Sequence, residues 1–162
     1  MPDIKRLFTK LFMDQDIKQK IEFFSQVTIL NGLGNFDIGK LVTDMNCRAY
    51  DAQEVIYGEQ ELGKALFIIM SGEVAITRKS GLLKEEKVIA RLKSGDFFGE
   101  MALLEAIPRA ATAKALTSCK ICIIYKASFD SMIAKDPKIG IVVFKNIAVI
   151  LASRLLGKSG GG

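Results

Sequence analysis

The sequence predicts a mainly β domain with helices at both ends, arranged as a sandwich, a barrel or a roll. Eight short apolar segments alternate with glycine or charged turns in the middle of the chain. Apolar residues recur at helical spacing before these segments and again after Tyr125. The 162 residues suffice for one domain with a buried core and a short arm.

The first element is a helix predicted over residues 3–24, within an N-terminal helical arm of residues 1–35. One apolar stripe is formed by Ile4, Leu7, Phe8, Leu11 and Phe12. We expect this stripe to pack on its own domain or on a partner copy. The alternative is a helix that lies on a membrane surface, and three nearby aspartates weaken it because they dilute the positive charge.

The central region begins with a loop at residues 31–35 and a short helix predicted at 36–45. The strands that follow are predicted at 48–50, 54–57, 65–71, 73–77, 84–92, 97–99, 111–115 and 119–125. Glycines at most of the turns between them are Gly58, Gly63, Gly72, Gly81 and Gly95. This region and the helices after it are expected to form one unit over residues 36–157.

A short helix is predicted at residues 128–134, and a long one follows it. Asp136 is a good N-cap residue and Pro137 a good first helical residue, while Gly157 suits the end. Between residues 139 and 152 this helix is apolar almost all round. One face must therefore cover its own domain, and we expect the other to form a homodimer through residues 138–156. The tail at 158–162 is expected to be flexible.

Composition argues against catalysis. The chain has no histidine, which excludes Ser-His-Asp and Cys-His nucleophile systems and His-ligated zinc or iron sites. We expect no enzymatic activity and no metal. The net charge of +5 favours anionic ligands in general and does not by itself indicate nucleic acid.

The cysteines indicate a reducing environment. Their number, three, is odd, and no secretory signal precedes them, so a cytoplasmic location is expected. Cys119 and Cys122 form a C-x-x-C pattern on a predicted strand, where positions i and i+3 point to opposite faces. We therefore expect these two cysteines to pack in the core and neither to share a metal nor to pair with each other.

The segment at residues 95–113 carries the strongest functional signal. Gly99 permits a close backbone approach to a ligand, and residues 101–105 are long enough for one helical turn. Pro108 stiffens the return of the chain, and Arg109 then re-enters the neighbourhood of Glu100. An Arg fork fits phosphate oxygens and a Glu accepts from hydroxyl groups, so a ligand with one phosphate and one ribose hydroxyl would satisfy both.

This segment closely resembles the phosphate-binding cassette of cyclic nucleotide-binding domains, the family of catabolite activator proteins and protein kinase A regulatory subunits. The matching residues are Phe-Gly-Glu-x-Ala-Leu and, after a short variable stretch, Pro-Arg-Ala-Ala-Thr. The resemblance extends over about residues 36–156, with Gly58-Glu59, a Ser-Gly-Glu-Val turn at 71–74 and Gly95-Asp96. It implies an eight-stranded antiparallel β-roll, a jelly-roll-like double-stranded β-helix, with an N-terminal and a long C-terminal helix.

The resemblance also implies roles for individual residues. Glu100 would accept the ribose 2′-hydroxyl with help from the Gly99 backbone, and Arg109 would pair with the cyclic phosphate. The N–H groups of Ala102 and Ala110 would complete the phosphate cradle. Met101 is included among the ligand-binding residues, on the base side or against the short helix. Since Ala110 stands where cGMP-selective members often have Thr, cAMP is expected as the ligand, with cGMP possible.

The implied mechanism is a regulatory one. Bound nucleotide would draw the cassette inward, and the C-terminal helix would shift to cover the base and carry the signal to an unidentified protein effector. Asn146, Ser153 and Arg154 are the polar lid candidates. The chain ends at Gly162 without a DNA-reading module, so no nucleic-acid partner is expected, and membrane contact is not expected either.

Two alternatives stay open at this point. Glu100 and Arg109 could form a plain salt bridge in a roll that has lost its ligand. The other alternative is that the domain serves only as a protein–protein interaction and dimerisation module, through its apolar helix.

Overall fold

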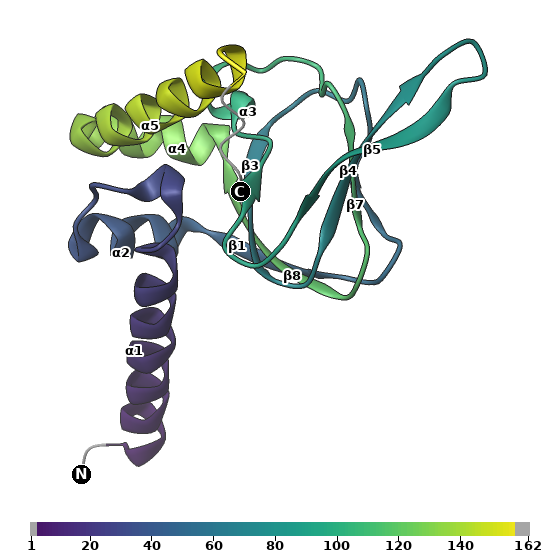
Figure 1. The fold of residues 1–162 in the computed structure, drawn as a ribbon. Helices are drawn as coiled ribbons and strands as arrows, with labels where there is room; N and C mark the ends of the chain where they lie inside the picture. Colours follow the sequence, from purple (N-terminus) through teal and green to yellow (C-terminus); the bar gives the residue numbers. More distant parts are fainter. Residues whose placement is uncertain (1–2, 158–162) are drawn as a thin grey trace.

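The computed structural model describes residues 3–157 and contains two four-stranded antiparallel sheets that form a roll (Figure 1). One sheet has the order β1-β8-β3-β6 and the other β2-β7-β4-β5. The strands are β1 (Asn46–Tyr50), β2 (Val55–Tyr57), β3 (Ala65–Ser71), β4 (Val74–Ser80), β5 (Glu85–Leu92), β6 (Phe97–Phe98), β7 (Thr112–Ala115) and β8 (Cys119–Tyr125). The eight-stranded antiparallel roll expected from the sequence is confirmed.

Helices precede the strands of the roll and follow them, and one short helix lies between β6 and β7. They are α1 (Ile4–Phe24), the 3₁₀ turn η1 (Thr28–Leu30), α2 (Asn35–Asp44), α3 (Met101–Leu104), α4 (Lys126–Lys135) and α5 (Pro137–Leu155). Each α-helix lies close to its predicted position, whereas no helical turn was predicted at η1. None of these helices has both the length and the hydrophobicity needed to cross a bilayer, within the part of the chain that the structure describes.

The hairpin of β4 and β5 is longer than predicted. β4 continues to Ser80, three residues beyond the predicted end at Thr77, and it pairs with β5 down to Glu85. The polar sequence after Thr77 gave no apolar alternation, but an antiparallel partner satisfies its backbone groups. In Figure 1 this hairpin extends away from the rest of the roll.

The core consists of two apolar clusters on opposite faces of the β1-β8-β3-β6 sheet. One cluster fills the roll and includes Phe67, Ile69 and Cys119. The other lies between this sheet and the helices and includes Ile68 and Cys122. The alternation along β8 thus places Cys119 and Cys122 on opposite faces, as predicted.

Cys122 has a covalent partner. It forms a disulfide with Cys47 on β1, its direct partner in the antiparallel register, whereas Cys119 is a buried free thiol. Both Cys119 and Cys122 pack in the core and do not pair with each other, as expected, but the sequence analysis did not anticipate the bond of Cys122 to Cys47. The pairing depends on the register of two strands 75 residues apart, which no local spacing reveals.

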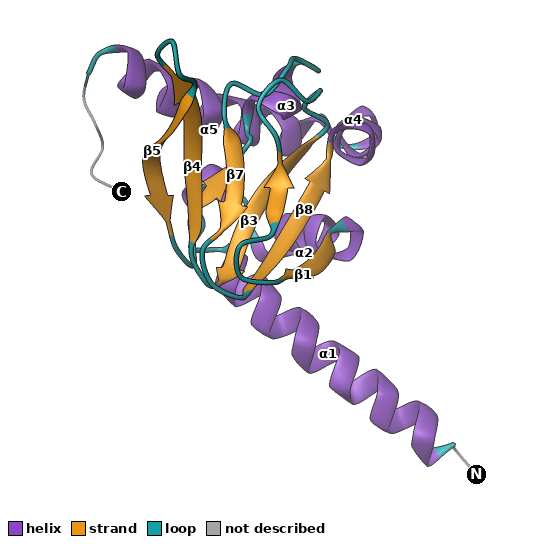
Figure 2. Ribbon diagram, turned by 90° about the vertical axis from the view of Figure 1, so that its right-hand side faces the viewer, coloured by secondary structure: helices purple, strands orange, loops and turns teal. Residues whose placement is uncertain are grey.

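The N-terminal helix projects from the body of the molecule (Figure 2). Its C-terminal end, with Phe24, belongs to the core between sheet and helices. Of the predicted apolar stripe, Ile4 is largely exposed. The other four side chains of that stripe lie outside the described part of the structure, as does the tail at 158–162.

Helix α5 has one buried and one exposed apolar face. Ile139, Val143 and Ile147 are buried in the core beside the sheet. Ile141 and Val149 are 67% and 58% exposed. As expected, one apolar face of α5 packs against its own domain. The other apolar face is exposed in the described structure.

Helix α5 begins where the sequence predicts. Pro137 is its first residue and Asp136 stands at the N-cap position. The Asp136 side chain also accepts a hydrogen bond from Lys40 Nζ on α2, at 2.7 Å. The carboxylate thus joins two helices by an ion pair.

Two further contacts fix the first part of α5. Lys138 lies 3.3 Å from the buried carboxylate of Asp37 on α2. Asn146 Nδ2 donates to the carbonyl oxygens of Ile29 and Asn31, at 2.9 and 2.8 Å. The helix is therefore anchored to the N-terminal helices up to about its midpoint.

Candidate functional site

A pocket of about 180 Å³ opens where the chain passes from β6 through α3 toward β7. Its lining residues are Tyr57, Gly99, Glu100, Met101, Ala102, Ile107, Pro108, Arg109, Ala110 and Ala111. All six site residues expected from the sequence are among them. The structure thus brings these residues together, and their binding of a ligand stays a prediction.

Arg109 is held in place before any ligand arrives. Its Nη2 donates to the Ala65 carbonyl at 2.8 Å and its Nη1 to the Gly99 carbonyl at 3.2 Å. The guanidinium lies over the Tyr57 ring, 4.2 Å from its centroid, and only 8% of the residue is exposed. Since a guanidinium carries five N–H donors, these two bonds leave donors for an anion.

The surroundings of Arg109 are electrostatically mixed. Burial lowers the pKa of Arg109, whereas Tyr57, Glu100 and Glu61 act in the opposite direction. The group nevertheless keeps its positive charge, because an arginine does not deprotonate in a protein. Burial also raises the pKa of Tyr57 to about 12, so its hydroxyl is neutral at physiological pH. The pocket therefore presents a preformed cation on an aromatic wall.

The glycine at position 99 is required by this arrangement. Its φ is +76°, which side chains rarely adopt, and an added Cβ would lie 2.6 Å from Arg109 Nη1. The absence of a side chain thus allows the guanidinium to approach the backbone. Gly99 near the start of the cassette and Arg109 near its end thus fit against each other.

Backbone bonds tie the returning segment to the loop between β2 and β3. Arg109 N donates to the Glu61 carbonyl at 2.7 Å, and Gln60 N donates to the Arg109 carbonyl at 2.8 Å. Arg78 Nε on β4 donates to the Ala110 carbonyl at 3.0 Å. Both sheets therefore position the residues on either side of the Arg109 side chain.

Glu100 is 4% exposed and pairs with Arg154 near the end of α5. Arg109 and Glu100 do not form a salt bridge with each other, so that alternative is wrong. Of the three lid candidates, Arg154 alone contacts the site, because Asn146 bonds to the backbone at η1 and Ser153 to its own helix. The sequence analysis names Arg154 as one of three lid candidates but does not distinguish it from the other two.

The two backbone amides expected at a phosphate differ from each other. Ala102 N donates to the Gly99 carbonyl at 3.2 Å. In the described part of the chain, no oxygen accepts a hydrogen bond from the Ala110 amide. Met101 is 44% exposed at the pocket, whereas Leu103 is buried beneath it. The short turn thus has one side toward the pocket and one toward the core.

Tyr57 is the residue of this site that sequence analysis missed. Its position is the last of the strand predicted at residues 54–57. A tyrosine that ends a strand carries no functional signal of its own, and its place beside Arg109 follows from the pairing of β2 with β7. No three His, Cys, Asp or Glu side chains among residues 3–157 are grouped so as to hold a metal ion.

The fold and the pocket define a β-roll domain with a buried cation in a small ligand-sized pocket. Comparison with known proteins agrees with this class. The sequence model described as "Cyclic nucleotide-binding domain" matches residues 47–136, more than half of the chain. The chain therefore belongs to the cyclic nucleotide-binding domain family.

Individual relatives cover different shares of the chain. The cAMP-dependent protein kinase regulatory subunit of Yarrowia lipolytica is 35% identical over 111 residues, which are 68% of this chain and 28% of that protein. The crystal structure of the Thermus thermophilus catabolite activator protein has a TM-score of 0.71 and 28% identity, over 81% of this chain and 59% of that one. This chain thus corresponds to part of each.

A single-domain structure is also similar. A cyclic nucleotide-binding domain from Methylobacillus flagellatus has a TM-score of 0.75 with 22% identity, over 92% of this chain and 87% of that one. At this identity the likeness concerns the fold. It supports the two-sheet roll with helices at both ends of the chain.

Proposed function

We propose that this protein is a non-catalytic regulatory module that binds a cyclic nucleotide in the pocket beside Arg109. The observation that carries the proposal is the preorganised Arg109 guanidinium, buried in a pocket formed by the cassette sequence. A buried cation without an ion-pair partner is costly, and an anionic ligand would compensate for it. A cyclic phosphate has the charge and the oxygens that the free donors require.

Each pocket residue then has a role. Arg109 and the Ala110 amide bind the phosphate, and the Ala102 amide joins them after releasing the Gly99 carbonyl. Glu100 accepts the ribose 2′-hydroxyl, with the Gly99 backbone close by. Met101 provides an apolar contact at the mouth of the pocket.

The ligand we favour is cAMP. Ala110 has no hydroxyl, so it cannot donate a hydrogen bond to a guanine as a threonine could at this position. The kinase regulatory subunit among its relatives is described as cAMP-dependent, which supports the same choice. We expect cGMP to bind more weakly.

The signal would be carried by the second half of α5. Its first half is anchored by Lys138 and Asn146, whereas its end reaches the pocket through Arg154. A ribose that bonds to Glu100 would displace Arg154 and release this end of the helix. The change would reach a protein effector or a partner copy bound to the exposed face of α5.

A thermal shift assay tests the proposal. With cAMP at about a hundred times its dissociation constant, the free energy of unfolding should rise by about 2.7 kcal/mol. Arg109→Ala should abolish the shift, while Arg48→Ala, an exposed arginine on β1, should retain it. Equal shifts in all three proteins would overturn the site assignment.

A second candidate function is a ligand-independent interaction module. The exposed face of α5 with Ile141 and Val149 favours it, since large apolar side chains in water mark contact surfaces. It predicts oligomers with no response to either nucleotide. The assay above separates the two functions.

A further inference from the structure

The disulfide between Cys47 and Cys122 is placed where its state affects a whole edge of the roll. β1 is the outermost strand of its sheet and pairs with β8 alone. The bond joins the two strands at directly opposed residues. When it is broken, only ladder hydrogen bonds and side-chain packing hold β1 to the sheet.

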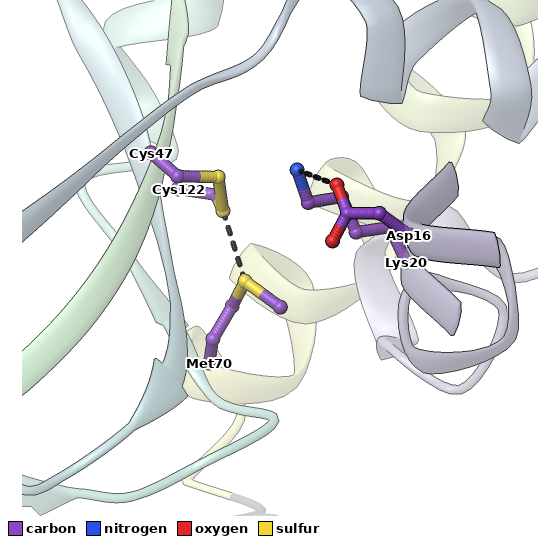
Figure 3. The surroundings of a disulfide bond; sticks show 5 residues. All are labelled: Asp16, Lys20, Cys47, Met70 and Cys122. Carbon is purple, nitrogen blue, oxygen red and sulfur yellow. Dashed lines mark hydrogen bonds and ion pairs between the residues drawn. A yellow bond between two sulfur atoms is a disulfide. The ribbon is translucent and has the colours of Figure 1, made fainter. Parts of the chain in front are cut away.

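The two sulfur atoms differ in their surroundings. Cys122 is fully buried, and its Sγ lies 3.1 Å from Met70 Sδ (Figure 3). Cys47 is only partly buried, at the edge of the core between sheet and helices. The Cys47 side of the bond is therefore nearer to solvent than the Cys122 side, and it is the side at which a reagent would attack.

The two bonded strands also lead into helices: α2 precedes β1, and α4 follows β8. β1 follows α2 after a single residue, and β8 runs directly into α4. The loop that the bond closes spans 75 residues and contains β2 to β7 and the whole pocket. Figure 3 also draws the Asp16–Lys20 ion pair of α1 among the surroundings of the disulfide. The bond therefore lies close to the N-terminal helices, which also pack against the core and bond to α5.

We propose that Cys47 is a reversible thiol-exchange site, at which small thiols or a dithiol protein open the Cys47–Cys122 bond in the folded protein. A thiolate attacks Cys47 Sγ, the S–S bond breaks, and Cys122 leaves as a thiolate that takes up a proton. A second thiol attacks the reagent sulfur of the mixed disulfide. The protein then has two new thiols, and two reagent thiols have been oxidised to one disulfide.

Counting thiols by mass spectrometry after alkylation tests the exchange. Protein oxidised by glutathione disulfide should show one alkylated cysteine in denaturant, which is Cys119. After dithiothreitol treatment of the folded protein, an alkylating quench in denaturant should show all three. Three thiols in the oxidised sample, or one thiol in the folded sample after dithiothreitol, would overturn the proposal.

Hydrogen exchange and thermal unfolding test the consequence. On reduction, the amides of β1 should exchange at least tenfold faster, while those of β4 should be unchanged, and Tm should fall by roughly 5–15 °C. Cys47→Ser should reproduce the reduced protein without reductant. Cys119→Ser should keep the full response to reductant, because this thiol lies outside the bond. Unchanged β1 exchange in both the reduced protein and Cys47→Ser would contradict the structural role.

None of these readouts requires a nucleotide. A protein that fails to bind cAMP would leave this proposal intact, and a permanent or absent disulfide would leave the proposed function intact.

Discussion

Arg154, near the end of the last helix, forms an ion pair with Glu100, a buried carboxylate of the pocket. The contact joins residues 54 positions apart and is the one side-chain hydrogen bond that the structure gives between α5 and the cassette in the described chain. The Arg154 guanidinium thus occupies the Glu100 carboxylate, to which the ribose hydroxyl is expected to bond. Under the proposed function, ligand binding and helix position would be coupled through this one carboxylate.

Replacing Arg154 should strengthen nucleotide binding. In Arg154→Met the ribose no longer competes for Glu100, so the affinity for cAMP should rise about threefold to tenfold. The modest size reflects the solvent exposure of the arginine, whose pairing is worth about 1 kcal/mol. Titration calorimetry measures the change, with Ser153→Ala as control. Weaker binding in Arg154→Met would mean that Arg154 contacts the nucleotide instead of competing with it.

Gly99→Ala should abolish tight binding through the displacement of Arg109. The new Cβ would lie 2.6 Å from Arg109 Nη1, so the guanidinium must move. We expect the affinity for cAMP to fall at least a hundredfold. Gly81→Ala is a matched control, because Gly81 has the same φ of +76° and nothing within 4 Å of an added Cβ.

Strain at positive φ should lower the stability of both glycine variants by about 1–2 kcal/mol. Gly99→Ala should lose more than Gly81→Ala, because its displaced guanidinium also loses the bonds to the Ala65 and Gly99 carbonyls. Urea denaturation checks this. If Gly81→Ala lost binding as completely as Gly99→Ala, the effect would be general backbone strain rather than the contact with Arg109.

Much of the fold follows from local sequence signals. Helix α5 begins at Pro137 and strands β3 and β8 have their predicted bounds, because proline placement and apolar patterning are local. The cassette was found because its residues are close together in the chain. Tyr57 and the Cys47–Cys122 bond were missed because strand pairing between distant segments creates them. Arg154 could not be chosen from three polar candidates without the path of α5.

Tyr57 should make the stability of the protein pH-dependent in alkali. Its pKa is raised by burial from 10.0 to about 12, so the folded state favours the neutral hydroxyl. This contribution is fully present below pH 10 and is lost as pH rises toward 12, by about 2–3 kcal/mol in total. Urea denaturation at pH 8 and pH 11 should show about half of this loss, roughly 1.4 kcal/mol.

Tyr57→Phe serves as the comparison, because it keeps the ring and removes the ionisable group. The wild type should lose more stability than Tyr57→Phe over this pH range, while cAMP affinity should be nearly equal in the two at pH 7. Identical alkaline losses in both proteins would show that other groups cause the effect.

Asn146→Ala should destabilise the fold without weakening the pocket directly. The substitution removes the bonds to the carbonyl oxygens of Ile29 and Asn31, one of them partly buried. We expect the free energy of unfolding to fall by about 1–3 kcal/mol. Lys145→Ala, at the exposed neighbouring position, should change it by less than about 0.5 kcal/mol. Equal effects of the two substitutions would argue against the anchor.

The exposed face of α5 should hold a homodimer together. Ile141 and Val149 lie two helical turns apart and are both more than half exposed. Val149→Glu should convert a dimer to monomers in analytical ultracentrifugation, whereas Val55→Glu, at an exposed position on β2, should not. A wild-type protein that sediments as a monomer at high concentration would refute the dimer.

Calorimetric titration of the wild type and Arg109→Ala with cAMP and with cGMP tests the proposed binding site most directly. We expect saturable binding of cAMP by the wild type, weaker binding of cGMP, and no measurable binding of either by Arg109→Ala. Circular dichroism should show that the variant is folded. Absence of heat with both nucleotides in the wild type, at several temperatures, would contradict nucleotide binding, and unchanged cAMP affinity in folded Arg109→Ala would contradict the role of Arg109.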